Sequence, residues 1–356
     1  MKRIDTFLEL TVKQSASDLH LVAGQAPRIR IHGVIHPVRF RELSNEDVRA
    51  MLDEIMSDLH RQRLADELAV DFSHYVEGLG RFRVNAYQQM HGLAAVLRVI
   101  PSEVPTLEQL GLPDAVRVNV AQPKGLILVT GPTGSGKSTT LAAIVDYINA
   151  NRKGHIITLE DPIEYVHSFK QCLISQREIH LHAPSLAGAL RDAVREDPDV
   201  ILVGELRDAE SVALALTAAE TGIQILGTLH TSGASRTVDR IVNTFPAKRQ
   251  EQARSMLADS LRMVVSQRLV RAVDGGKRIA AMEILVNTKA SKAIIRSGAS
   301  HKLASVIQTG GGVGMQSLDA ALKAAVQNGV VSAAEAAEHA IDRTLFEDRL
   351  ARAEAF

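Results

Sequence analysis

A phosphate-loop sequence of the form G-x-x-x-x-G-K-[ST] occupies residues 131–138, which read Gly131-Pro132-Thr133-Gly134-Ser135-Gly136-Lys137-Ser138. The apolar run 126–130 precedes the loop, and residues 140–144 follow it with helical spacing. A loop between a strand and a helix is the setting in which this motif binds phosphates. A glycine-rich turn that binds nothing is the alternative, but it does not explain the strand and the helix on either side. The sequence therefore predicts a P-loop protein that binds a nucleoside triphosphate.

The residue types in the loop match the chemistry of a triphosphate. Glycines allow successive backbone N–H groups to curl around the phosphates, and the following helix presents its positive end to them. We expect the Lys137 ammonium to reach the β- and γ-phosphates of ATP, and the Ser138 hydroxyl to be a ligand of Mg²⁺. Thr139 lies nearby on the first helical turn. The nucleotide contacts predicted from the loop are Gly131, Pro132, Thr133, Gly134, Ser135, Gly136, Lys137, Ser138 and Thr139.

Bulk properties limit the class of protein. A chain of 356 residues exceeds the usual size of one hydrophobic core, so two domains are expected. Lysine plus arginine equals aspartate plus glutamate at 41 each, so nucleic acid is not expected as a partner. Cys172 is the only cysteine, which excludes an intramolecular disulfide and a four-cysteine zinc module. The N-terminus lacks the apolar core of a signal peptide, and no run of ~20 apolar residues occurs, which predicts a soluble, cytoplasmic protein.

The first 98 residues differ in pattern from the rest of the chain. Amphipathic helical segments mix there with alternating strands, and residues 28–34 are typical of a hairpin with its turn at His32-Gly33. Two prolines, Pro101 and Pro105, then interrupt both helix and interior strand. We therefore predict an N-terminal domain over residues 1–98 and a linker over 99–113.

Beyond the linker, apolar runs of strand length alternate with helical stretches, which predicts an α/β domain over residues 114–286. The candidate strands are 126–130, 155–159, 200–204 and 223–229. They are apolar throughout, as expected for a parallel sheet that is covered on both faces. From about residue 287 to residue 356 the pattern indicates short, alanine-rich helices.

Two acidic segments are candidates for the catalytic chemistry. Residues 199–205 form an apolar strand that ends in Glu205, the pattern of a Walker B segment whose carboxylate addresses the Mg²⁺ shell. Residues 159–164 place Glu160, Asp161 and Glu164 after the preceding strand, where hydrolysis needs a group that orients or deprotonates water. Periodicity does not decide among these three carboxylates, and we favour Glu164 as the base.

A histidine and several arginines complete the candidate site. His230 follows the last apolar strand, where it could contact the γ-phosphate at the same edge of the sheet. Arg81, Arg83 and Arg98 lie on alternating strands of the N-terminal domain, and in an oligomer such arginines could reach the nucleotide of a neighbouring subunit. The histidines show no H-E-x-x-H spacing, so a zinc site is not expected.

Four segments together resemble the ATPases of type II secretion, type IV pilus and type IV secretion systems. They are the P-loop 131–139, the acidic segment 158–167, the Walker B region 199–207 and the histidine segment 228–231. The similarity continues through residues 16–21 near the start and through 245–246 and 315–319 beyond the core, so it covers nearly the whole chain. It is closest to the pilus-retraction members of that family.

The resemblance implies a structure and a set of roles. It implies a PAS-like N-terminal domain, a RecA-like motor domain with a helical C-terminal part, and a homo-hexameric ring that hydrolyses ATP with Mg²⁺. Position by position, it implies Glu164 as the catalytic glutamate, Glu205 at the Mg²⁺ site and His230 as the histidine of the family's His box. It also implies that Arg81, Arg83 and Arg98 point toward a nucleotide. It further implies that the motor works at the cytoplasmic face of the inner membrane, with a platform protein of that membrane as its partner. A motor paralogue is a possible second partner.

Two positions depart from the family pattern. Ile223 stands where a histidine is common, and Ser297 replaces the acid of the C-terminal retraction motif, although Arg296 of that motif is present. The leading hypothesis is a motor for pilus retraction and twitching motility. The alternatives are a pilus-assembly or type II secretion ATPase, a nucleotide-binding accessory subunit, and, last, a nucleic-acid translocase that the balanced charge disfavours.

Overall fold

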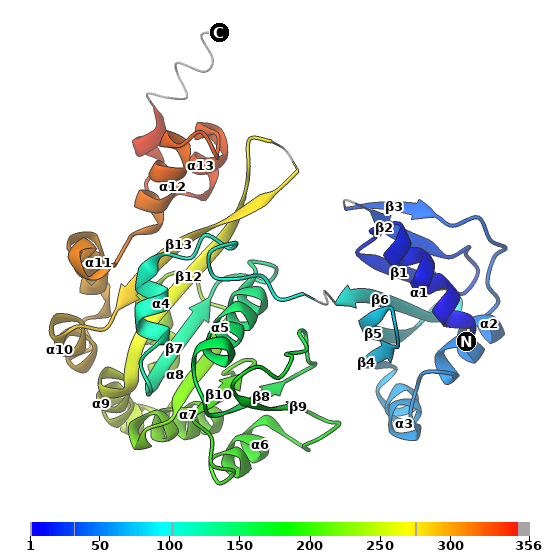
Figure 1. Cartoon of the computed structure of the whole chain (residues 1–356), viewed down its shortest axis with the longest axis horizontal. Coiled ribbons are helices and arrows are strands. Elements are labelled where there is room, and N and C mark those ends of the chain that lie inside the picture. The colour runs from blue at the N-terminus through cyan, green and yellow to red at the C-terminus, as the bar shows by residue number, and fades with distance from the viewer. Residues whose placement is uncertain (1, 32, 101–102, 275, 348–356) are drawn as a thin grey trace. The chain divides into compact units, whose positions relative to one another are not determined.

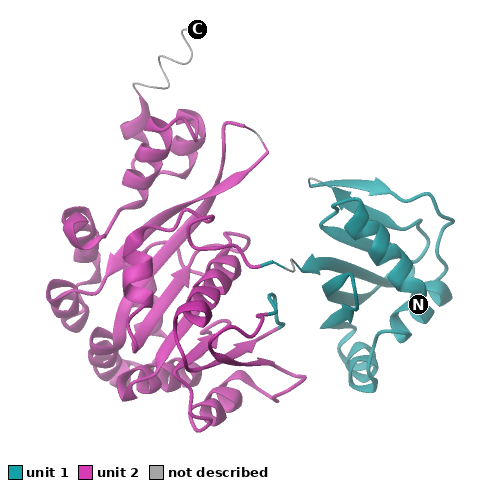
Figure 2. Cartoon of the chain, in the orientation of Figure 1, with its two compact units in different colours: residues 1–103, 162–166 teal, residues 104–161, 167–356 magenta. Residues whose placement is uncertain are grey.

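The computed structural model describes residues 2–31, 33–100, 103–274 and 276–347 (Figure 1). The chain forms a mixed α/β fold with two sheets and divides into two compact units (Figure 2). Unit 1 comprises residues 1–103 and 162–166, and unit 2 comprises residues 104–161 and 167–356. Pro101 and Ser102 of the predicted linker, and residues 348–356 of the predicted helical region, lie outside the described residues.

Unit 1 contains an antiparallel sheet with helices packed against it. Its six strands have the order β3-β2-β1-β6-β5-β4. The strands are β1 (Asp18–Val22), β2 (Arg28–Ile31), β3 (Val34–Pro37), β4 (Ala69–Val76), β5 (Gly80–Gln89) and β6 (Gly92–Ile100). The helices are α1 (Arg3–Lys13), α2 (Asn45–Asp53) and α3 (Asp58–Glu67).

Alternation along the strands explains how unit 1 forms its core. Phe82, Val84 and Ala86 of β5 are fully buried, whereas the residues between them are only half-buried, as expected for a sheet with one covered face. The hairpin predicted over residues 28–34 is confirmed, because β2 and β3 pair antiparallel. His32 of its predicted turn lies outside the described residues.

Unit 2 is built on a seven-stranded sheet of order β13-β12-β7-β11-β10-β8-β9. Neighbouring strands from β12 to β9 are parallel, and only the pair of β12 and β13 is antiparallel. The strands are β7 (Gly125–Thr130), β8 (His155–Glu160), β9 (Leu173–Glu178), β10 (Val200–Val203), β11 (Gln224–Leu229), β12 (Leu261–Arg271) and β13 (Arg278–Val286). The four predicted strands are confirmed as β7, β8, β10 and β11, whereas β9, β12 and β13 were not predicted.

Helices cover both faces of this sheet (Figure 1). Leu126 and Leu128 of β7 belong to one core, and Ile127 and Val129 belong to the other, so successive residues point into different cores. The helices α4 (Asp114–Val120) and α5 (Lys137–Asn151) pack on one face. The helices α6 (Leu186–Ala193), α7 (Ala209–Thr221), α8 (Ala234–Asn243) and α9 (Gln250–Ser260) pack on the other. Coverage on both sides is the reason that the central strands are apolar throughout.

Short helices follow the last strand, as the sequence predicted. They are α10 (Lys289–Ser297), α11 (Leu303–Thr309), α12 (Leu318–Gln327) and α13 (Ala333–His339). Leu318, Leu322 and Phe346 form a separate small core with Val270 of β12 and Ala281 of β13. Across the described residues, each helix is too short or too polar to pass through a bilayer.

Candidate nucleotide site

The phosphate loop lies at the carboxyl end of the central strand β7 and leads into α5. Gly134 and Gly136 adopt φ values of +77° and +85°, a region that glycine enters at little cost, and Gly136 is the N-cap of α5. The first turn of the helix, residues 137–140, carries no carboxylate, so its positive end is left for an anion.

Lys137 is held inside the loop. The side chain is buried, and its Nζ donates to the backbone oxygens of Gly131 and Pro132, each at 3.0 Å. These bonds position the ammonium within the curve of the loop, where a phosphate can replace the carbonyl acceptors. The geometry is therefore that of a charged group prepared for an anionic ligand.

Glu205 lies two residues beyond the end of β10. Its Oε2 is 2.7 Å from Arg207 Nη2 and 3.2 Å from His230 Nε2. Burial raises the pKa of the Glu205 carboxyl, but the hydrogen bond and charge of Arg207, together with His230, outweigh this effect and hold the pKa below its ordinary value. Glu205 is therefore ionised near neutral pH, as a carboxylate at a metal shell needs to be.

His230 connects Glu205 to the phosphate loop. Its Nε2 faces Glu205, and its Nδ1 lies 3.5 Å from Thr133 Oγ1. The adjacent strand ends explain this placement, because Leu229 of β11 pairs with Thr130 of β7 directly before the loop. The structure thus brings together the loop, Glu205 and His230, which the sequence analysis had assigned to one site.

The three candidate carboxylates, at the end of β8 and just after it, lie in different surroundings. Glu160 Oε1 accepts hydrogen bonds from Thr158 Oγ1 at 2.7 Å and from Gln176 Nε2 at 3.4 Å. Asp161 is near enough to Arg207 for its charge to add to the rise in the arginine's pKa, of which the hydrogen bond to Glu205 is the main cause. Glu164 belongs to unit 1, where its Oε1 lies 3.6 Å from Arg83 Nη1. Hydrogen bonds thus hold the Glu160 carboxylate at the end of the strand.

The three candidate arginines of unit 1 have partners within that unit. Arg98 Nε is 2.7 Å from Asp18 Oδ1, and Arg81 Nη1 donates to Ser73 Oγ at 2.9 Å. Arg83 pairs with Arg98 in the β-ladder and is 3.6 Å from Asp71. These contacts hold the three guanidinium groups, which belong to residues of β5 and β6. The roles of these arginines toward a nucleotide stay predictions.

Gln267 was missed in the sequence analysis. It lies on β12, is almost fully buried, and contacts both the phosphate loop and α5. One signal could have revealed it, because a glutamine between the apolar pairs 264–265 and 269–270 is a candidate for burial and then needs polar partners.

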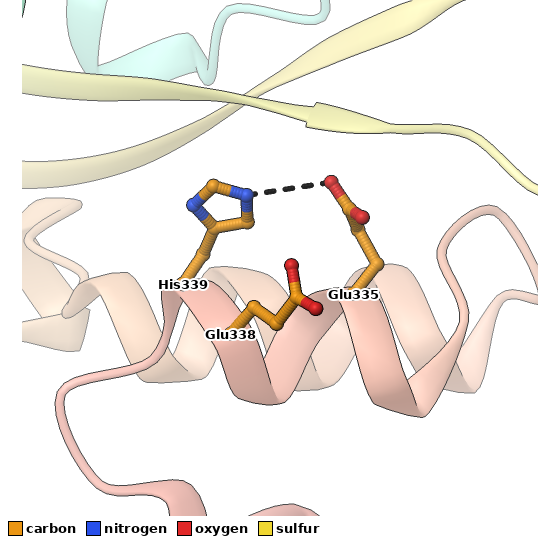
Figure 3. A group of neighbouring side chains, drawn as sticks. All are labelled: Glu335, Glu338 and His339. Atoms are coloured by element: carbon orange, nitrogen blue, oxygen red, sulfur yellow. Dashed lines mark ion pairs between the residues drawn. The ribbon is translucent and has the colours of Figure 1, made fainter.

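One group of three candidate metal ligands occurs within the described ranges, and it lies apart from the phosphate loop. Glu335, Glu338 and His339 share one side of α13 (Figure 3). Glu335 already accepts a hydrogen bond from the backbone N–H of Arg271 at 2.8 Å and lies 3.3 Å from His339 Nε2. The bond from Arg271 attaches α13 to the end of β12, which is a structural role that needs no metal.

The two departures from the family pattern have ordinary structural partners. Ile223 packs against the core between the sheet and the helices α6 to α9. Arg296 forms an ion pair with Asp259, and Ser297 Oγ donates to the backbone oxygen of Ile294 at 2.9 Å. Arg296 therefore connects α10 to α9 without the missing acid.

Comparisons with known proteins agree along nearly the whole chain. The model for type II/IV secretion system proteins matches residues 1–318. The type IV pilus retraction ATPase PilT of Pseudomonas aeruginosa is 49% identical over 337 residues, which are 95% of this chain and 98% of that protein. The type IV pilus ATPase PilU of the same organism is 38% identical over 336 residues, or 94% and 88% of the two chains.

A solved structure extends the agreement to three dimensions. The crystal structure of the pilus retraction motor PilT with bound ADP superposes with a TM-score of 0.90 at 43% identity, covering 98% of this chain and 99% of that one. The resemblance drawn from the four motifs is therefore confirmed, and the chain belongs to the family of type II/IV secretion system proteins.

Proposed function

We propose that this chain is the motor subunit of a type IV pilus retraction machine, in which ATP hydrolysis drives pilus disassembly and twitching motility. The observation that carries the proposal is the joint placement of Lys137, Glu205 and His230 at one edge of the sheet. It occurs in a chain that is more similar to PilT than to PilU, at 49% against 38% identity. The PilT structure was solved with bound ADP, which supports nucleotide binding by this chain.

The nucleotide is held by the phosphate loop. Backbone N–H groups of the loop surround the phosphates, and Lys137 exchanges its carbonyl acceptors for phosphate oxygens. Ser138, with Thr139 beside it, and Glu205 supply a hydroxyl and a carboxylate, hard oxygen donors that suit Mg²⁺. When bound, Mg²⁺ neutralises charge on the β- and γ-phosphates.

The remaining residues act around the γ-phosphate. Glu164 orients or deprotonates the attacking water, and His230 keeps Glu205 in contact with the loop through Thr133. Arg81, Arg83 and Arg98 stabilise transition-state charge on a nucleotide in the assembled ring. Their place on two adjacent strands of unit 1 supports a shared role.

The architecture supports a ring motor. We assign residues 1–98 to a PAS-like domain, 99–113 to a linker, 114–286 to a RecA-like core and 287–356 to a helical region. The antiparallel sheet of unit 1 and the mainly parallel sheet of unit 2 support these two classes. The homo-hexamer acts at the cytoplasmic face of the inner membrane on the pilus platform protein, alone or with a motor paralogue.

Surface pili and motility test the proposal. Cells whose only copy of the gene encodes Glu205→Gln are compared with wild type and with Glu220→Gln, an exposed glutamate on α7. We expect abundant pili and lost motility for Glu205→Gln, and wild-type behaviour for the control. Bare cells would instead indicate pilus assembly or export, and normal motility would contradict the retraction proposal.

A further inference from the structure

Gln267 uses both ends of its buried amide. Its side chain is 1% exposed. Nε2 donates to the backbone oxygen of Ser135 at 2.6 Å, and Oε1 accepts from Thr140 Oγ1 at 3.0 Å. Ser135 is in the phosphate loop and Thr140 is in the first turn of α5. One side chain therefore connects the loop to the start of the helix that follows it.

The strand register places Gln267 directly beside the loop. Ser266 of β12 pairs with Thr130, the last residue of β7, so Gln267 is one residue beyond that pair. The contact is close enough to limit the loop's residue types. A Cβ atom on Gly131 would collide with the backbone oxygen of Gln267, and one on Gly136 would lie 3.2 Å from Gln267 Nε2.

The bond to Ser135 fixes the direction of a loop carbonyl. If the oxygen of Ser135 points toward β12, the peptide N–H that follows points the opposite way, because the two groups of a trans peptide are antiparallel. That N–H belongs to Gly136. An anion-binding loop needs successive N–H groups that point into one concavity, and the bond from Gln267 fixes the direction of one of them.

We propose that Gln267 is a positioning residue for nucleotide binding, which holds the phosphate loop in its anion-binding curve before the nucleotide arrives. The inference rests on the function proposed above for residues 131–139. A loop that populates the competent curve only part of the time binds with an apparent affinity lowered by that fraction. Gln267 therefore acts on the dissociation constant of the nucleotide through the free protein.

A matched control is available at the other end of the sheet. Gln224, at the start of β11, is also fully buried and also uses both ends of its amide. Its Nε2 donates to the backbone oxygen of Val120 at 2.9 Å, and its Oε1 accepts from Arg152 Nη1 at 2.6 Å. Gln224→Leu removes the same kind of bonds as Gln267→Leu, away from the loop.

The experiment compares ADP binding and the thermal midpoint of wild type, Gln267→Leu and Gln224→Leu in the full chain. We expect both variants to lose thermal stability, and only Gln267→Leu to bind ADP about tenfold more weakly, as for the loss of one net hydrogen bond. Gln267→Glu separates the two bonds, because a carboxylate accepts from Thr140 but cannot donate to Ser135. We expect it to weaken ADP binding as Gln267→Leu does.

The outcomes separate the inference from the function on which it rests. Wild-type protein that does not bind ADP would refute the proposed function. Wild-type binding with an unchanged dissociation constant in Gln267→Leu would refute the role of Gln267 alone. An equal loss of affinity in Gln224→Leu would also refute it, because the effect would then be general. If Gln267→Leu does not fold, Gln267→Met, which keeps the length of the side chain, is measured with the same expectation.

Discussion

Glu205→Gln removes one charge from the nucleotide site and keeps the shape of the side chain. The amide oxygen can still accept from Arg207, whose Nη2 lies 2.7 Å from Glu205 Oε2. Arg207 is 71% exposed, so solvent screens the ion pair. An exposed pair contributes only about 0.5 kcal/mol to the free energy of unfolding. We therefore expect the thermal midpoint to fall by no more than about 2 °C.

The effect on hydrolysis is expected to be much larger. A preorganised charged group at the reacting centre contributes about 10²–10³ to kcat, and its loss raises the barrier by about 3–4 kcal/mol. ADP binding depends mainly on the loop and Lys137, so its dissociation constant should change by less than about threefold. The predicted pattern is a stable protein that binds nucleotide and turns over slowly.

Steady-state ATP hydrolysis, ADP titration and thermal unfolding on the same preparation check this pattern. Glu220→Gln is the control, since it makes the same chemical change on the exposed side of α7. Turnover by Glu205→Gln within twofold of wild type would refute the assignment of Glu205. A thermal midpoint lowered by about 10 °C would refute the reasoning on screening, because it would imply an ion pair of several kcal/mol.

Three further perturbations test other parts of the site and the fold. Lys137→Ala should weaken ADP binding about 10- to 150-fold, as expected for a lost charged hydrogen bond, and an unchanged titration would contradict the phosphate-loop assignment. His230→Ala should lower kcat about tenfold, because the link from Glu205 to Thr133 is lost, and should change ADP affinity by less than about threefold. Equal losses in kcat and in ADP affinity would contradict this role. Burial lowers the pKa of His167 to about 4. As pH falls from 6.5 to 4, this histidine takes up a proton in the unfolded chain but not in the folded one, so the free energy of unfolding decreases over that range. Urea unfolding at pH 7 and pH 4 should show a loss of stability about 3 kcal/mol larger in wild type than in His167→Gln, because the other titrating groups act in both proteins, and equal losses would contradict it.

The sequence was sufficient for the parts of the fold that depend on local pattern. The strands β7, β8, β10 and β11 are buried on both faces, so each appears as a mainly apolar run. Strand β9 lies at the edge of the sheet and exposes Leu173, so its pattern resembles a loop or a surface segment. The motif at 131–138 was sufficient to predict the phosphate loop, because its glycines and its lysine all serve the binding of phosphates.

The sequence was insufficient where the site depends on contacts between distant residues. Glu160, Asp161 and Glu164 are close in sequence, yet the structure gives each a different partner. Gln267 is 132 residues from the Ser135 carbonyl to which it donates. Periodicity predicts which residues share one face of a strand, but it does not predict which loop will contact that face.

Strand β12 contacts the phosphate loop on one face of the sheet and the start of α8 on the other. Successive residues of a strand point to opposite faces, so Gln267 meets the phosphate loop while Ser266 turns to the other side. There Ser266 Oγ accepts from the backbone N–H of Gly233 at 2.8 Å, and its cross-strand partner Glu283 accepts from Ala234 at 2.7 Å. Burial raises the pKa of Glu283, while its bond to Ala234 opposes the rise.

Gly233 and Ala234 follow His230 by three and four residues and begin α8. One strand and its antiparallel neighbour therefore hold both the phosphate loop and the segment that follows the site histidine. The same two strands carry α12 and α13, through Val270 and Ala281. Strand β12 is therefore shared by the phosphate loop, the start of α8 and the C-terminal helices, which it contacts through Gln267, Ser266 and Val270.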